Sequence, residues 1–184
     1  MSLLRYNLSS FRKFLNKFFA IVIESNEKEH DLFMENKKEK AMDLFENGCN
    51  CSQAVLLAFS EEFGLDKENA EALAVAFGGG MSKQGKTCGC LSGALMVIGL
   101  QFGKESTKVI ANRGNSYKMG KEFIEKFYTE FGATDCRELI RLDLNKKDDL
   151  EMATKTVFGN RCKNMVGITA EMLQLFLKEK ASKL

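Results

Sequence analysis

The sequence of 184 residues contains no proline, no tryptophan and only one histidine, His30. Proline interrupts helices and makes up about 5% of an average protein, so its complete absence favours a chain built mostly of helices. The aromatic residues are 15 phenylalanines and 3 tyrosines, which indicates core packing and not platforms for stacking nucleic-acid bases. With a single histidine, any metal site would have to be made mainly of sulfur ligands.

Strong net charge and long apolar runs are also missing. Charged residues make up 28% of the chain, but the formal net charge is only +2, so we expect no nucleic-acid partner. No stretch approaches the roughly 20 apolar residues of a membrane span, and the apolar run 18–23 is too short for the core of a secretory signal. We therefore expect a cytoplasmic protein without stable membrane insertion.

The first 33 residues differ from the rest. They hold a basic amphipathic piece, residues 4–23, which is followed by a polar hinge, and Met34 then opens a stretch typical of a cytosolic amino terminus. We predict one helical domain at residues 34–184. Residues 1–33 are expected to be an N-terminal extension outside the fold or a mis-assigned start.

Apolar residues recur at helical spacing throughout residues 34–184, and no alternating strand pattern competes with it. The prediction is an all-α fold, a compact bundle of about six to eight helices joined by glycine-rich loops. Gly114 is a candidate interruption of the longest helix. The expected helices cover residues 37–46, 52–63, 67–77, 90–102, 106–131, 148–157 and 169–180. Asp66 is expected to cap the helix 67–77. A further short helix is expected to run through residue 142 after a cap formed by Thr134 and Asp135.

The stretch 77–103, FGGGMSKQGKTCGCLSGALMVIGLQFG, combines a glycine-rich loop with an apolar helix. Gly89 and Gly93 are spaced so that another backbone can approach this helix closely. That feature makes a homodimer a candidate assembly.

Six cysteines are too few for a disulfide scaffold, which typically holds more than about 8% cysteine. In a reducing compartment, spaced cysteines favour metal or redox chemistry over structural bridges. Helix amino termini stabilise thiolates, and Cys51, Cys88, Cys90 and Cys136 fall at predicted helix starts. Cys162, which follows Gly159, is a weaker case.

The segment CGCLSG at residues 88–93 resembles the C-G-A-x-x-G box of the redox-active protein family C_GCAxxG_C_C, which is named for four cysteines. Cys51, Cys88, Cys136 and Cys162 match these four in order. Cys90 stands where the family has alanine, and Cys49 is additional. The resemblance implies a redox-active cysteine protein and supplies no substrate.

Three chemistries remain open for these cysteines. Cys51, Cys88, Cys136 and Cys162 could bind zinc or an iron–sulfur cluster, for which four thiolates are a standard ligand set. Alternatively, Cys88 could be a reactive thiolate that Cys90 or Cys51 resolves, with an unidentified redox partner or small-molecule substrate. The third alternative is that the cysteines are buried and inert. The function that competes with redox chemistry is a non-catalytic structural module that binds zinc or an iron–sulfur cluster.

Residues 80–87, GMSKQGKT, match the phosphate-loop pattern G-x-x-x-x-G-K-[ST]. If this loop bound a nucleotide, Gly78, Gly79, Gly80 and Lys86 would be the cofactor-binding residues. The pattern needs a preceding strand, and the sequence predicts none. Independently of nucleotides, lysines in this loop could attract an anionic substrate to the thiols.

Overall fold

The computed structural model describes residues 36–103 and 109–182, and the predicted extension 1–33 lies outside the described residues. Regular structure in the described part is helical, which confirms the all-α prediction. That part has no strand, and residues Thr87 and Asp135 form an isolated antiparallel bridge. No helix within the described ranges is long and apolar enough to cross a membrane.

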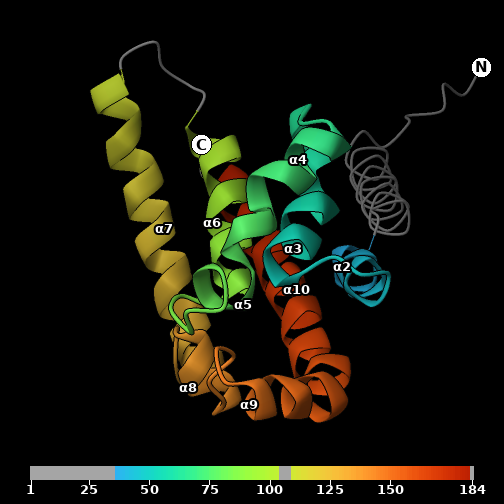
Figure 1. Ribbon diagram of the computed structural model, residues 1–184. Helices are drawn as coiled ribbons and strands as arrows, with labels where there is room; N and C mark the ends of the chain where they lie inside the picture. The colour runs from blue at the N-terminus through green and yellow to red at the C-terminus, as the bar shows by residue number, and fades with distance from the viewer. Residues whose placement is uncertain (1–35, 104–108, 183–184) are drawn as a thin grey trace, which may run out of the picture. The chain divides into compact units, whose positions relative to one another are not determined.

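The helices follow one another in the order shown in Figure 1. The α-helices are α2 (Lys37–Glu46), α3 (Cys51–Ser60), α4 (Lys67–Ala74), α5 (Gly78–Met81), α6 (Gly89–Phe102), α7 (Val109–Phe131), α8 (Cys136–Ile140), α9 (Lys147–Met152) and α10 (Lys163–Ala181). The short 3-10 helices η1 (Glu61–Phe63) and η2 (Val75–Phe77) extend α3 and α4. The π-helix η3 (Ala153–Cys162) joins α9 to α10.

The larger hydrophobic cluster, which we call the main core, is built on the packing of α3 against α6 and α10, with α2, α4 and α7 around them. Its largest side chains with almost no exposure include Phe59, Phe123, Phe127, Phe176, Leu56 and Leu91. A Cβ atom at Gly93 would lie 2.7 Å from the Ser52 carbonyl oxygen. Gly93 is therefore required for the close approach of α6 to α3, as the sequence predicted.

A second cluster, the minor core, consists of Cys136, Ile140, Leu144, Ala153 and Cys162 from α8, η3 and the loop between α8 and α9. Apolar residues of α9 and η3 pack around it. Cys51 and Phe45 contact both clusters. Because Cys88 and Cys90 belong to the main core, the cysteines lie at the boundary between the two clusters.

Four of the predicted helices were wrong at their ends or breaks. Helix α7 continues through Gly114, and its predicted start at 106 lies outside the described residues. Helix α8 ends at Ile140 because Arg141 adopts a left-handed conformation with φ 58°. The predicted helices 148–157 and 169–180 are parts of one continuous segment, since the backbone stays helical from α9 through η3 into α10.

Glycine explains why the sequence suggested a gap in this last segment. A glycine within a helix costs only about 1 kcal/mol relative to alanine, so packing can offset it. At Gly167 the packing is direct, because a Cβ atom there would lie 2.5 Å from the Met42 sulfur. Cys162 is consequently the last residue of η3 inside a continuous helical path, and not at a free helix start.

Candidate functional site: a cluster of five thiols

Five of the six cysteines surround one small enclosed cavity between α3, α5, α6, α8 and η3. They are Cys51, Cys88, Cys90, Cys136 and Cys162. The cavity measures about 10 Å³, which is close to the minimum that holds one water molecule. All six cysteines are free thiols. The four cysteines that were predicted as a set are therefore neighbours, and Cys90 joins them.

Asn50 positions Cys51 as the first residue of α3. The Asn50 side chain accepts hydrogen bonds from the Ser52 and Gln53 backbone amides, both at 3.1 Å. In return, the Asn50 backbone N–H donates to the Gln53 side-chain oxygen at 3.0 Å. The Asn50 side-chain amide also donates to the Val75 carbonyl at 2.9 Å. This reciprocal cap fixes the amino terminus of α3, and with it the Cys51 sulfur.

Cys51 is at the centre of a hydrogen-bonded chain of thiols. Its sulfur interacts with the thiols of Cys162 and Cys90, and Cys90 interacts in turn with Cys88. The thiols of Cys162 and Cys90, together with the Cys51 backbone N–H, lower the pKa of Cys51 well below its usual value in spite of burial. An activated thiolate at a helix start is the form of cysteine that attacks disulfides.

The partners of Cys51 hold their protons more tightly than an ordinary thiol. The hydrogen bond to Cys51 and burial raise the pKa of Cys162. The hydrogen bonds to Cys51 and Cys88, again with burial, raise the pKa of Cys90 well above its usual value. A single negative charge on Cys51 is thus stabilised by two thiols that act as donors.

Backbone pairing brings Cys88 and Cys136 together from distant parts of the chain. The Cys88 amide donates to the Thr134 carbonyl at 2.8 Å, and the Cys136 amide donates to the Lys86 carbonyl at 2.7 Å. Burial, with the neighbouring thiols Cys88 and Cys51 adding to it, raises the pKa of Cys136 to about 12. Cys136 therefore remains a neutral thiol at physiological pH.

The glycines beside the site are needed because functional residues pass close to their backbones. A Cβ atom at Gly80 would lie 2.6 Å from the Cys136 Cβ atom, and one at Gly78 would lie 2.6 Å from the Asn50 side chain. At Gly89 the corresponding distance to the Cys51 Cβ atom is 3.0 Å. The glycine-rich stretch is thus a packing surface for the thiol cluster.

The chain after Gly78 takes a left-handed turn. Gly79, Gly80, Met81, Ser82 and Lys83 all have φ between 52° and 67°. Left-handed backbone costs non-glycine residues about 1–2 kcal/mol each, so contacts must hold this turn in place.

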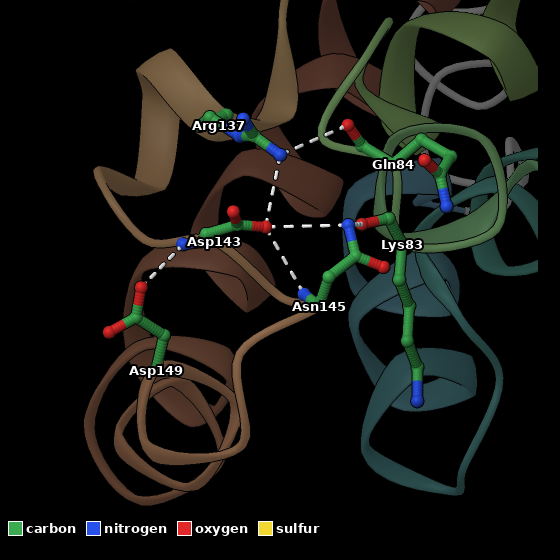
Figure 2. Close-up of polar contacts among 6 residues, drawn as sticks. All are labelled: Lys83, Gln84, Arg137, Asp143, Asn145 and Asp149. Atoms are coloured by element: carbon green, nitrogen blue, oxygen red, sulfur yellow. Dashed lines mark hydrogen bonds and ion pairs between the residues drawn. The ribbon is translucent and has the colours of Figure 1, made fainter.

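Polar contacts from the α8–α9 region supply such a restraint (Figure 2). The Asn145 side-chain amide donates to the Lys83 carbonyl at 3.1 Å, and the Arg137 guanidinium pairs with Asp143 at 3.0 Å. The pKa of Asp143 is lowered by the Asn145 backbone N–H and further by Arg137. The Asp143 amide donates to the Asp149 carboxylate at 2.8 Å, which ties the network to α9.

The phosphate-loop interpretation gains no support from this geometry. The backbone amides of residues 82–86 all donate to backbone carbonyls, whereas a phosphate loop presents its amides to the ligand. The segment before the loop is helical, and Lys86 is exposed. Gly78 and Gly79 line a pocket described below, and Gly80 packs against Cys136. Their role in cofactor binding stays a prediction.

An open pocket of about 400 Å³ adjoins the thiol cavity. Cys51, Cys136 and Cys162 contribute to its wall, whereas Cys88 and Cys90 line only the inner cavity. Cys49 also lines the pocket, and burial followed by the Glu71 charge raises its pKa. The remaining lining residues are Phe45, Asn50, Val75, Gly78, Gly79, Ser82, Lys83, Leu144, Leu150 and Phe158.

The thiols do not form a metal-binding cage in this conformation. Within residues 36–103 and 109–182, no group of three or more His, Cys, Asp or Glu side chains is arranged to hold a metal ion. The 10 Å³ between the sulfurs has no room for an iron–sulfur cluster. The set Cys51, Cys88, Cys136 and Cys162 as zinc or cluster ligands stays a prediction.

Sequence reasoning missed Asn50 and the residues that restrain the left-handed turn. An asparagine followed three residues later by Gln53 is a capping-box signal, and it would have placed the start of α3 at Cys51. Asn145 carries no comparable signal, because its contact with Lys83 joins residues far apart in sequence.

Comparison with known proteins gives one match. The model of a family described as "Putative redox-active protein (C_GCAxxG_C_C)" matches residues 49–176. Neither a curated protein nor a solved structure matches this chain. The matched residues include all six cysteines and the whole of the pocket wall except Phe45.

Proposed function

Because this chain belongs to the C_GCAxxG_C_C family of putative redox-active proteins, we propose that it carries out thiol–disulfide exchange with Cys51 as the attacking thiolate and Cys162 as the resolving thiol. The observation that carries this proposal is that Cys162, Cys90 and Cys88 lie with Cys51 around one small cavity, while Cys51 is also at a helix start and in a pocket wall. We assign to Cys51 the role that the sequence suggested for Cys88, because Cys88 does not line the pocket.

The exchange needs two steps. The Cys51 thiolate attacks one sulfur of a substrate disulfide R–S–S–R, so that a Cys51–S–S–R mixed disulfide forms and R–S⁻ leaves. Cys162 then gives up its proton to solvent, and the Cys162 thiolate attacks the Cys51 sulfur, which releases the second R–S⁻. The substrate gains two electrons, and the protein keeps a Cys51–Cys162 disulfide.

Proton positions in the cluster suit this order of events. Cys162 holds its proton while Cys51 is a thiolate, since the hydrogen bond to Cys51, burial and the Cys51 charge all raise the pKa of Cys162. Once Cys51 enters the mixed disulfide, that charge is gone and Cys162 loses its proton more easily. The first step therefore activates the second.

Cys90 and Cys88 form an inner pair behind Cys51. Cys90 hydrogen-bonds to both Cys51 and Cys88, and both inner cysteines are almost fully buried. In the proposed reaction, Cys90 stabilises the Cys51 thiolate as a donor. We assign these two residues to tuning Cys51 and not to the first contact with substrate.

Serine variants test these assignments in protein that has been reduced and treated with a chelator. The reagent is 4,4′-dithiodipyridine, which releases one 4-thiopyridone, measured by its ultraviolet absorption, for each leaving thiolate. Wild-type protein should release two molecules of thiopyridone for each molecule of reagent consumed. Cys162→Ser should stop at the mixed disulfide after one equivalent, and Cys51→Ser should lose the fast phase.

Cys49→Ser is the matched control, because Cys49 lies two residues from Cys51 and lines the same pocket without joining the chain of thiols. The Cys49→Ser protein should keep the fast phase of thiopyridone release and should still release two equivalents. A fast phase that survives in Cys51→Ser would contradict the proposal. So would a Cys162→Ser protein that still releases two equivalents.

A further inference from the structure

We propose that the pocket beside Cys51 binds a small organic disulfide with an apolar body and an acidic group, and that Lys83 pairs with that group. This inference rests on the proposed thiol–disulfide exchange, for which it names the substrate class. It follows from the walls of the pocket, from its charge and from the way in which Lys83 is held.

Apolar side chains make most of the pocket wall. Phe45 and Phe158 lie at the wall together with Val75, Leu144 and Leu150. A volume of about 400 Å³ falls in the lower part of the range of about 300–1,000 Å³ that is typical of small-molecule sites. The pocket therefore suits a molecule with one or two rings or a similar apolar body.

The pocket wall carries one positively charged side chain in addition to the Cys51 thiolate. Lys83 is the one lysine or arginine among the described residues of its wall, and no aspartate or glutamate lies among them. Lys83 forms no ion pair with another residue in the described part of the chain. An acidic group on the ligand would find its complement there.

The backbone of Lys83 is fixed. Its carbonyl accepts from the Asn145 side chain at 3.1 Å, and its amide donates to the Gly78 carbonyl at 3.4 Å. Figure 2 shows the Lys83 side chain extending away from Arg137 and Asp143, so the ammonium group is separated from this network. The backbone that carries the Lys83 side chain is thus held in place at the pocket wall, and the side chain itself is exposed.

The pocket brings the reactive sulfurs to the same ligand. Cys51 and Cys162 form part of the wall, so a disulfide bound there meets first the attacking and then the resolving thiol. Both R–S⁻ products carry the acidic group as well as the thiolate charge. The disulfide itself is the oxidant, and two acidic thiols are the reduced products.

The experiment compares two aromatic disulfides, 2,2′-dithiodibenzoate with two carboxylates and 4,4′-dithiodipyridine without them. Lys83→Glu should slow the reaction with the dibenzoate about fivefold, as expected for an exposed charge pair, and leave the neutral reagent within about twofold of wild type. Lys83→Gln should show a smaller change in the same direction. Salt at about 1 M should reduce the difference, because screening then acts over about 3 Å.

Lys86→Glu is the matched control. Lys86 is exposed on the same loop but does not line the pocket. It should change the rate with either reagent by less than about twofold, since distant exposed charges are screened. If Lys83→Glu slowed the reaction with both reagents equally, or if Lys86→Glu slowed the dibenzoate reaction as much as Lys83→Glu, the inference would be overturned. The proposed thiol–disulfide exchange would still stand.

A redox-inert analogue separates this inference from the proposed function. The thioether 2,2′-thiodibenzoate should bind Cys51→Ser protein in calorimetry, and Lys83→Glu in that background should weaken binding about fivefold. If the thioether bound in this way but neither disulfide reacted with wild-type protein, thiol exchange would be overturned and the ligand-binding role of the pocket would be supported. No thioether binding, or binding that is independent of Lys83, would overturn the inference.

Discussion

The two hydrophobic clusters differ in how their helices are built, and the thiols lie where the clusters meet. The main core uses regular helices in close contact, as at Gly93 of α6 against Ser52 of α3. The minor core is enclosed by the five-residue α8, the π-helix η3 and connecting loops. Cys51 contacts both.

This difference assigns separate tasks to the two sides of the site. The main core holds Cys51 and the inner pair Cys88 and Cys90 at fixed helix positions. The minor core supplies Cys162 and Cys136 from segments with fewer buried neighbours, which are the segments that open most readily in proteins. In the proposed exchange, the attacking thiol Cys51 therefore lies at a capped helix start, and the resolving thiol Cys162 lies on the side that we expect to open more readily.

The largest effect is expected from crowding the main core. Gly93→Val should lower the free energy of unfolding by about 3 kcal/mol, because the added atoms meet the Ser52 carbonyl and the Val55 side chain. Gly99→Ala is the control in the same helix, since nothing lies within 4 Å of its Cβ position. It should be neutral or stabilise by up to about 1 kcal/mol in urea unfolding. Equal effects of the two substitutions would contradict this packing.

Alkylation rates should separate Cys51 from Cys136. Near neutral pH, Cys51 should react with iodoacetamide about a hundredfold faster, since its larger thiolate fraction outweighs the lower nucleophilicity of a low-pKa thiolate. The Cys51 rate should level off below pH 9, because its pKa is lowered. The Cys136 rate should still rise tenfold per unit at pH 10, because its pKa is about 12. Mass spectrometry of the labelled peptides measures both, and a Cys51 rate still rising at pH 10 would count against a stabilised thiolate.

Truncations in the two clusters should behave differently. Leu91→Ala in the main core should reduce global stability by about 3 kcal/mol and leave the alkylation rate of Cys136 in the native protein unchanged. Leu144→Ala in the minor core should cost about 2 kcal/mol and increase the Cys136 rate, because it opens local structure around that thiol. Similar Cys136 rates in both variants would contradict the separation into two clusters.

The smallest effect on stability is expected at the helix caps. Asn50→Ala and Asn36→Ala should each cost about 1 kcal/mol, because each asparagine caps two backbone amides. Only Asn50→Ala should also slow Cys51 alkylation, since Asn36 caps α2 and takes no part in the thiol site. A slower Cys51 in both variants would show that the rate reports stability and not the position of this thiol.

The sequence was sufficient for the helical class, for most helix bounds and for the need for glycine at Gly93. These features depend on local periodicity, caps and small residues, which can be read along the chain. It also predicted Cys51, Cys88, Cys136 and Cys162 as one set, and these four lie around one cavity. It did not predict the continuous helical path through Gly159 and Gly167; the cost of glycine in a helix is small, and at Gly167 close packing against Met42 of α2 accounts for the glycine.

The roles that we propose for individual thiols could not be predicted from the sequence. Cys51 and Cys88 both occupy helix starts, but only Cys51 also lines the open pocket, and this depends on how α5 and η3 pack. The position of Lys83 depends on a left-handed turn that contains three non-glycine residues and is held by Asn145. Neither feature has a local sequence signal.

The most direct test of the central claim is to identify the first disulfide that forms in the reduced protein. One equivalent of 4,4′-dithiodipyridine is added, the reaction is quenched with acid, and the cysteine pairs are mapped by mass spectrometry. We predict a Cys51–Cys162 disulfide, with Cys88, Cys90 and Cys136 still reduced. A first disulfide between Cys88 and Cys90, with Cys51 and Cys162 both free, would contradict the account.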